Sequence, residues 1–278
     1  MDDQLLELFP ASGRNVPLTG LYLGHDLRSR TAPCVFSNFI VSLDGRIALP
    51  APASGLLRVP PVIANRRDWR LYLEIAAQAD VLLTTARHLR AVAAGRHGDL
   101  LAVTAQPDLR AWRTARGLPP SPAVAAVSKD LDIPVGVTAD LPGPLCVLTT
   151  DSAPAARERV LAAAGIRVWR LPGTTLDGAT LVAALTAAGY AIIYSIAGPR
   201  VLHALCTARM LNRLYLTQAT VLLGGEPCVP LLLGPELMPA LRTRLVACHL
   251  DPHAPPGAMQ LFSVYEIADD DEMNTPAT

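Results

Sequence analysis

The sequence predicts an α/β protein whose mixed sheet is parallel in its body and antiparallel at its C-terminal end. Three observations support this prediction. Apolar residues make up 51% of the 278 residues, which is enough for a sizeable core. Strand-like and helix-like segments alternate from Val35 to Thr220, an order typical of a largely parallel sheet with helices on both faces. Two later segments, 242–249 and 259–267, alternate in polarity and are expected to form an antiparallel pair.

The elements follow from hydrophobic periodicity and from turn residues. The run V-F-S-N-F-I-V at 35–41 is apolar and β-prone, so it is expected to be a buried strand. Residues 49–61 are rich in Pro, Ala, Ser and Gly and predict a loop. A helix is expected over 65–78, with Asn65 as its N-cap. Further strands are expected at 81–84, 123–127, 145–149, 166–171, 191–194 and 214–220, and further helices at 154–164, 178–188 and 199–209.

The chain is expected to form one domain over 35–268, because no internal repeat and no long linker is visible. Residues 1–34 contain scattered Pro and Gly and predict an irregular arm packed on this domain. Residues 269–278 predict a flexible tail.

Composition excludes several classes of protein. The formal net charge is zero, whereas a nucleic-acid binder normally has a basic excess, so a small-molecule ligand is expected. No secretory signal and no bilayer-spanning apolar run is visible. The five scattered cysteines indicate reduced thiols, and the histidines lack zinc-binding spacing. We therefore expect a soluble cytoplasmic protein without a membrane or metal partner. Lys129 is the only lysine, which argues against a P-loop kinase or a pyridoxal-phosphate enzyme.

The first candidate site follows the strand at 35–41. Asn38, Ser42 and Asp44 are two or four residues apart and share a face of the strand if it continues through Ser42. Asp44 precedes Gly45, so it is either a ligand-binding carboxylate or a turn aspartate that caps local N–H groups.

Three further loops join a strand to a helix or close an apolar run. L-T-T-D-S at 148–152 and I-A-G-P-R at 196–200 each lead into a helix, where free N–H groups suit a cofactor phosphate. V-L-L-G-G at 221–225 closes a long apolar stretch. An ordinary N-cap at 148–152 and a plain turn at 221–225 are the alternatives. Neither G-x-G-x-x-G nor G-x-S-x-G is present.

The order of four motifs resembles a known family. These motifs are N-F-x-x-S-L-D-G, A-D-V-L-L, G-P-x-x-x-x-A-L and L-x-L-T-x-A-x-V-L-L-G-G. They are similar to the pyrimidine reductases of riboflavin biosynthesis, the 5-amino-6-(5-phosphoribosylamino)uracil reductases. The resemblance extends from Val35 to the C-terminus and implies a dihydrofolate-reductase-like three-layer sandwich.

The resemblance also implies a homodimeric reductase that uses NADPH on a pyrimidine-like or pteridine-like substrate. Its substrate would lie near Asn38, Ser42 and Asp44, with Asp44 also as the catalytic candidate. Arg87, Arg170 and Arg200 are expected to favour NADPH over NADH, since a guanidinium suits a 2′-phosphate. The cofactor-binding residues implied are Thr85, Arg87, Thr149, Thr150, Gly198, Pro199, Gly224 and Gly225.

Three departures from the family pattern stand out. Thr85-Ala86-Arg87-His88 replaces G-A-G-T, so Arg87 either holds a phosphate or is a solvated loop arginine. Ile196-Ala197-Gly198-Pro199 replaces E-G-G-P, and Leu211-Asn212-Arg213-Leu214 replaces L-V-D-E-L. We therefore expect a divergent member with an altered substrate. A catalytically impaired member that binds a nucleotide or a partner protein is the main alternative, and an unrelated α/β transferase is another.

Overall fold

The structure, a computed structural model, consists of two compact units, where the sequence predicted one domain. Unit 1 comprises Met1–His25, Phe36–Tyr72 and Leu211–Thr278, and unit 2 comprises Asp26–Val35 and Leu73–Met210. The residues that the structure describes are 3–30, 32–51, 57–95, 103–141, 143–254 and 258–267.

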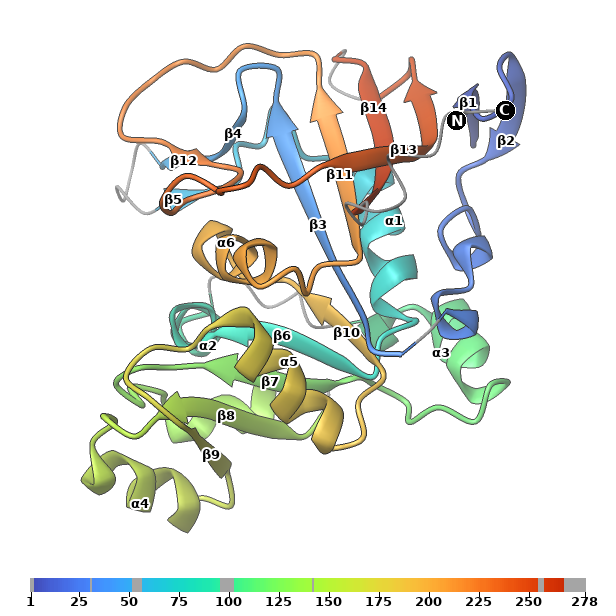
Figure 1. The fold of residues 1–278 in the computed structure, drawn as a ribbon. Coiled ribbons are helices and arrows are strands. Elements are labelled where there is room, and N and C mark those ends of the chain that lie inside the picture. Colours follow the sequence, from blue (N-terminus) through green and yellow to red (C-terminus); the bar gives the residue numbers. More distant parts are fainter. Residues whose placement is uncertain are drawn as a thin grey trace. The chain divides into compact units, whose positions relative to one another are not determined.

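Unit 1 is built on strands in the order β2-β1-β13-β14-β11-β3 (Figure 1). Its strands are β1 Gln4–Phe9, β2 Arg14–Pro17, β3 Cys34–Ser42, β11 Arg213–Ala219, β13 Thr243–Asp251 and β14 Gln260–Ile267. β11 runs parallel to β3 and antiparallel to β14, and β13 and β14 are antiparallel, as the sequence predicted for the C-terminal end. A small sheet in the order β12-β4-β5 adds β4 Arg46–Pro50, β5 Leu57–Arg58 and β12 Val229–Pro230.

Unit 2 carries the parallel body, in the order β10-β6-β7-β8-β9. Its strands are β6 Val81–Thr85, β7 Ala123–Val127, β8 Leu145–Thr150, β9 Arg167–Leu171 and β10 Ile192–Ser195. Each neighbouring pair is parallel. The inner strands β7 and β10 are almost entirely apolar and buried, as is typical of parallel strands covered on both faces, whereas the edge strand β9 carries Arg167 and Arg170.

The helices begin and end where caps and glycines indicate. They are α1 Arg66–Ala76, α2 Ala86–Ala93, α3 Pro107–Thr114, α4 Ala155–Ala163, α5 Gly178–Ala187 and α6 Pro199–Thr207. Asp177 caps α5 by accepting a hydrogen bond from the N–H of Thr180. A Cβ at Gly178 would lie 2.4 Å from the carbonyl oxygen of Ala204, so glycine is needed for α5 to pack closely on α6. Short 3₁₀ turns occur at Leu23–His25, Leu27–Ser29, Val103–Ala105 and Val135–Asp140.

Two expectations about irregular segments were wrong. Residues 4–17 are not an irregular arm: β1 pairs with β2 and, through Leu6 opposite Leu250, with β13. Leu5 and Glu7, two residues apart, form the buried face of β1, where Glu7 bonds to Arg14 at 2.7 Å. The loop expected at 49–61 contains the end of β4 and all of β5, while 52–56 lie outside the described residues. The predicted tail, 269–278, also lies outside them.

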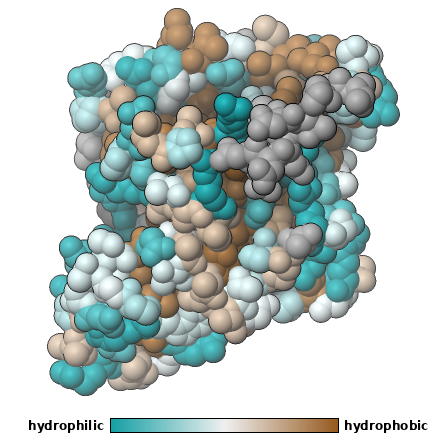
Figure 2. Space-filling view, viewed as in Figure 1, coloured by the Kyte–Doolittle hydropathy of each residue, from teal (hydrophilic) through white to brown (hydrophobic). Residues whose placement is uncertain are grey.

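Apolar side chains reach the surface of unit 1 (Figure 2). The most exposed are Met238 (80%), Leu222 (71%) and Leu43 (52%). Among the described helices, none is long and apolar enough to cross a membrane. All five cysteines are free in the structure.

Candidate functional site

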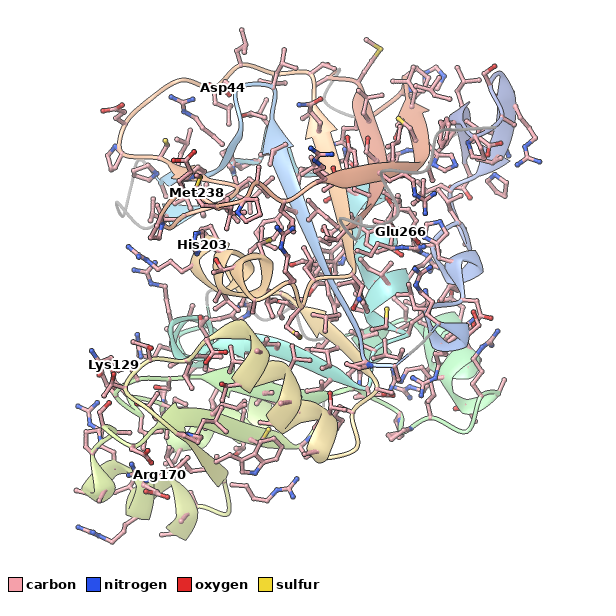
Figure 3. The ribbon with its side chains drawn as sticks, in the orientation of Figure 1. Asp44, Lys129, Arg170, His203, Met238 and Glu266 are labelled. Carbon is pink, nitrogen blue, oxygen red and sulfur yellow. The ribbon has the colours of Figure 1, made fainter. Side chains whose placement is uncertain are left out.

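The turn after β3 carries Asp44, which is labelled in Figure 3. β3 continues through Ser42, so Asn38 and Ser42 share one face of the strand, whereas Asp44 lies in the turn beyond it. Gly45 has φ +78°, a conformation that side chains disfavour, and it lets the chain turn directly into β4 at Arg46. The S-L-D-G motif is therefore the connection between two strands.

The Asp44 carboxylate joins this turn to the V-L-L-G-G loop at 221–225. The backbone N–H groups of Leu223 and Gly224 donate to it at 3.2 and 2.8 Å. Ser42 Oγ donates to Oδ1, and Arg46 Nη1 donates to Oδ2 at 2.7 Å. Four donors fill the acceptor positions that a carboxylate offers. The two most distant family motifs in the sequence are thus one local structure.

The same contacts determine the charge of Asp44. The hydrogen bond from Ser42, then those from Gly224 and Leu223 and the positive charge of Arg46, hold the pKa of its carboxyl well below the usual range. Asp44 is thus a carboxylate whose role here is to position the glycine loop. Gly224 and Gly225 have φ +60° and +82°, so this loop requires glycine at both positions. Direct contact between Asp44 and a substrate stays a prediction.

The other two candidate residues, both on β3, differ in whether they can contact a ligand. Ser42 is fully buried, and its hydroxyl bonds to Asp44 and accepts from the N–H of Arg46 at 3.0 Å. Asn38 is partly exposed and pairs in register with Tyr215 of β11. Asn38 is therefore the better placed of the two to meet a ligand.

The remaining candidates follow strands of the parallel sheet of unit 2. Thr85, Thr150 and Gly198 come at or just after the ends of β6, β8 and β10. Since parallel strands end at one edge of a sheet, these loops share the edge where such sheets bind ligands. Thr85 is the N-cap of α2, where it accepts from the N–H of His88, and Pro199 is the first residue of α6.

The loop after β8 is held from within unit 2. Thr149 is fully buried, and its hydroxyl has no hydrogen-bond partner among the described residues. Arg170 of β9, labelled in Figure 3, donates to the carbonyl oxygens of Thr150, Asp151 and Ala153 at 3.2, 3.1 and 3.0 Å. It also pairs with Glu158 of α4 at 2.7 Å. Arg170 therefore holds the loop rather than offering its guanidinium to a phosphate.

The residues at this edge fit an anionic dinucleotide. Arg87 and Arg200 are exposed in the first turns of α2 and α6, where helix N-termini attract negative charge. A Cβ at Gly198 would meet no atom within 4 Å outside its chain neighbours, so the backbone there is open to a phosphate. A hollow of about 370 Å³ beside α4 and β9 contains none of the candidates.

Sequence reasoning missed one polar pair in unit 1. Asp68 of α1 accepts a hydrogen bond from the hydroxyl of Thr217 on β11, and burial raises the pKa of Asp68 to about 6. The available signal was helical spacing. Asp68 lies four residues before Tyr72, so a carboxyl shares the face of a buried aromatic side chain.

The class of protein follows from this arrangement: an α/β protein of the dihydrofolate-reductase-like fold class, with loops suited to a phosphate-bearing cofactor. The family model of the RibD C-terminal domain matches residues 33–252. The chain therefore belongs to the RibD C-terminal domain family, which confirms the resemblance found in the sequence.

Solved structures show the same fold. A pyrimidine reductase-like protein of Corynebacterium diphtheriae matches with a TM-score of 0.64 and 22% identity, over 86% of this chain and 93% of that one. RibD of Acinetobacter baumannii matches with a TM-score of 0.58 and 15% identity, over 85% of this chain and 58% of that one. The riboflavin biosynthesis reductase Rib7 of Saccharomyces cerevisiae matches with a TM-score of 0.55 and 15% identity, over 90% of this chain and 99% of that one. A search of curated proteins finds no match.

Proposed function

We propose that this protein is a reductase that uses NADPH to reduce a pyrimidine-like or pteridine-like small molecule. Membership of the RibD C-terminal domain family and likeness to pyrimidine reductases support a reductase of this type. The observation that carries the proposal is the contact of Asp44 with Leu223 and Gly224, because it unites the two motifs that characterise the family.

The groups proposed to bind the cofactor belong to unit 2, and the groups proposed to bind the substrate belong to unit 1. A bound reduced nicotinamide would supply the hydride. The helix N-termini at Thr85 and Gly198 would bind its phosphates through backbone N–H groups. Asn38 and the glycine loop held by Asp44 would orient the substrate, since positioning of two reactants accounts for much of such a rate enhancement.

The departures at 85–88 leave groups that suit an anion, which supports the proposal of an active reductase. T-A-R-H forms a helix start in which Thr85 accepts from the N–H of His88, and it places the exposed Arg87 in the first turn of α2. Anion binding at this position therefore does not depend on glycines. The alternative, an impaired member that only binds a nucleotide or partner, predicts tight nucleotide binding without turnover. Incubating the protein and NADPH with 5-amino-6-(5-phosphoribosylamino)uracil and with a dihydropterin, and following NADPH oxidation, separates the two.

We expect NADPH to bind more tightly than NADH, by about tenfold or more, because a guanidinium forms charge-assisted bonds with a 2′-phosphate. Fluorescence titration of Arg87→Gln and Arg200→Gln with NADPH and NADH should identify which arginine is responsible. The variant that lacks this arginine should lose the preference for NADPH. Arg159→Gln, an exposed arginine of α4, is the matched control and should bind like the parent. Equal affinity of the parent protein for both cofactors would contradict this prediction.

A further inference from the structure

Residues 3–25, here called the N-terminal segment, pack on the sheet of unit 1 through two groups of contacts. The segment contains β1, β2 and the 3₁₀ turn Leu23–His25. It lies outside residues 33–252, which the family model matches, so its role does not follow from the family. Each group of contacts includes a histidine.

In the first group, β1 pairs with β13. Glu7 is opposite His249 in the register, and both residues are buried, at 5% and 4% exposed. The Glu7 carboxylate already pairs with Arg14 of β2 at 2.7 Å. Nδ1 of His249 is buried and has no hydrogen-bond partner among the described residues. Protonation would place a charge on a side chain that is almost out of contact with water, so the packed segment favours neutral His249.

In the second group, the 3₁₀ turn packs on β11. Nδ1 of His25 lies 3.0 Å from the hydroxyl of Tyr215, and the two rings are stacked, with 5.6 Å between their centroids. Tyr22 is fully buried and packs against both rings. Arg213 donates to the same hydroxyl at 3.4 Å. A tyrosine hydroxyl that accepts from a guanidinium can donate its own proton to a neutral imidazole, which His25 supplies.

Strand register places both groups of contacts on one face of the sheet. His249 of β13 is opposite Phe262 of β14, and Phe262 is opposite Thr217 of β11. Residues opposite one another lie on the same face, as do residues two apart on one strand, such as Tyr215 and Thr217. The bond to Tyr215 brings His25 to this face as well. The two histidines therefore hold the same segment to the same face.

The charges around the histidines also favour their neutral forms. Burial, the positive charge of Arg213 and the neighbouring His249 lower the pKa of His25 to about 3. Burial lowers the pKa of His249 as well. Glu7 opposes that shift, and Arg14 adds to it.

The remaining charged groups next to the segment are paired with one another. They are Glu266 with Arg213 and Arg244, and Asp251 with Arg67, which also donates to the carbonyl oxygen of Gln4. Asp68 of α1 lies on the same face through its bond with Thr217, and burial raises its pKa to about 6. Acid neutralises this carboxyl, which stabilises the packed state, so Asp68 does not account for a release of the segment in acid.

We propose that neutral His25 and His249 hold the N-terminal segment on the sheet of unit 1, and that protonation of these histidines releases it. The segment is thus a pH-sensitive element of the fold. Release separates His25 from Tyr215, which is opposite the candidate substrate residue Asn38 in the register. Release should therefore weaken substrate binding, and this consequence rests on the function proposed above.

The pH window follows from the direction of the shifts. A histidine whose pKa is lower in the packed state than in the released state contributes stability that is complete above the released-state pKa and is lost as the pH falls. For His25 the ordinary value is 6.5. Below it, each pH unit should favour release by about tenfold for each histidine, until the packed-state pKa is reached.

The first test measures amide hydrogen exchange between pH 7 and pH 5, expressed as protection factors. In the parent protein, protection in β1 should fall by about tenfold or more over this range, whereas protection in β7 of unit 2 should stay constant. In His25→Gln the fall should be smaller by about tenfold, because glutamine accepts the bond from Tyr215 and does not titrate. His253→Gln, at an exposed histidine just after β13, is the matched control and should behave like the parent.

The second test needs no variant. An NMR titration of the parent protein should show the His25 ring gaining its proton well below pH 6.5, together with the loss of protection in β1. A ring that titrates near pH 6.5 while β1 stays protected would overturn the inference, as would equal falls of protection in the parent and His25→Gln.

The third test measures binding of 5-amino-6-(5-phosphoribosylamino)uracil by calorimetry at pH 7 and pH 5.5. Affinity should fall more in the parent than in His25→Gln, a comparison that cancels the titration of the probe's own phosphate. Equal falls would refute the effect of release on the substrate. If β1 loses protection in acid but the parent never binds the probe, the segment is released as proposed and the proposed function fails for this substrate. If the parent binds the probe and β1 keeps its protection, the release is wrong and the proposed function stands.

Discussion

The carboxylate of Asp44 shows how much one residue can organise in this fold. It accepts bonds from two backbone N–H groups of a loop about 180 residues later in the sequence, as well as from Ser42 and Arg46. The identities of the residues in that loop do not predict this contact, because its donors are backbone N–H groups that every residue except proline carries.

We expect Asp44→Asn to lower the melting temperature and to accelerate amide exchange at Leu223 and Gly224, because an amide offers fewer acceptor positions and no charge for Arg46. The pKa of Asp44 is lowered in the folded state. Its stabilisation is therefore complete above the unfolded-state pKa and is lost as the pH falls. Parent and variant should converge in acid. Asp140→Asn, at an exposed aspartate of unit 2, should leave exchange at Leu223 unchanged.

Asp68 changes stability with pH in the direction opposite to Asp44. Its folded-state pKa is raised from 3.8 to about 6, chiefly by burial, so the folded protein holds this proton more tightly than the unfolded chain. Stability should fall as the pH rises through this window and then level off. Asp68→Asn should unfold at higher urea than the parent at pH 8, by about 3 kcal/mol at most, and the difference should vanish below pH 4. A less stable variant at pH 8 would show that the carboxylate stabilises the fold.

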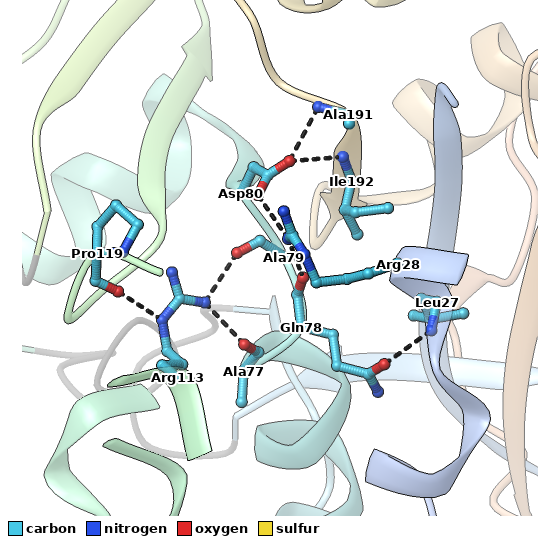
Figure 4. A network of polar contacts seen from close by, with 10 residues as sticks. All are labelled: Leu27, Arg28, Ala77, Gln78, Ala79, Asp80, Arg113, Pro119, Ala191 and Ile192. Atoms are coloured by element: carbon cyan, nitrogen blue, oxygen red, sulfur yellow. Dashed lines mark hydrogen bonds and ion pairs between the residues drawn. The ribbon is translucent and has the colours of Figure 1, made fainter. Parts of the chain in front are cut away.

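At the scale of elements, arginines hold the loops at both ends of the parallel strands of unit 2. Arg113 of α3 is fully buried and donates to the carbonyl oxygens of Ala77, Ala79 and Pro119, before β6 and β7 (Figure 4). Asp80 accepts from Ala191 and Ile192 at the start of β10. Backbone groups at this edge of the sheet, both carbonyl oxygens and N–H groups, are thus satisfied by side chains.

At the opposite edge, Arg170 performs the same task for the loop after β8. We expect Arg170→Lys to reduce the free energy of unfolding by about 1–3 kcal/mol, because an ammonium cannot reach three carbonyls and Glu158 together. Urea unfolding measures the loss. Arg157→Lys is the control on α4: its exposed contacts, with Asp132 at 3.9 Å and with a single carbonyl oxygen, that of Asp130, at 3.0 Å, should contribute less than about 1 kcal/mol. Equal stabilities of the two variants would contradict a holding role for Arg170.

At the scale of the whole molecule, residues 214–233 carry many aliphatic side chains and a single charge, Glu226. In the structure Leu222 is 71% exposed, and Leu43 and Met238 of the same unit are also exposed. An apolar surface of this kind favours association.

We therefore expect a homodimer at micromolar concentration, seen by light scattering, with this surface at its interface. Leu222→Asp should shift the protein toward monomer, because an unpaired charge in an interface is unfavourable. Val160→Asp places the same charge on α4 of unit 2, where the parent side chain is 58% exposed, and should leave the mass unchanged. A monomeric parent protein would refute the prediction.

Local sequence patterns were sufficient to predict the parallel body, the antiparallel C-terminal pair and the family. Strands such as Ala123–Val127 are short apolar runs between turn residues, and helices such as α5 have a cap and a terminal glycine. Because these signals lie within or next to each element, they are sufficient to predict it from the sequence. The family motifs are local in the same way.

Contacts between distant groups became visible only in the folded protein. β1 is a strand because it pairs with β13, more than 230 residues later in the chain. Asp44 meets Gly224, Arg170 meets the carbonyls after β8, and Asp68 meets Thr217 only when strands and helices have packed. Each of these contacts involves a backbone group or a buried side chain whose partner is set by strand register. Register depends on the packing of the whole sheet, which no local pattern encodes.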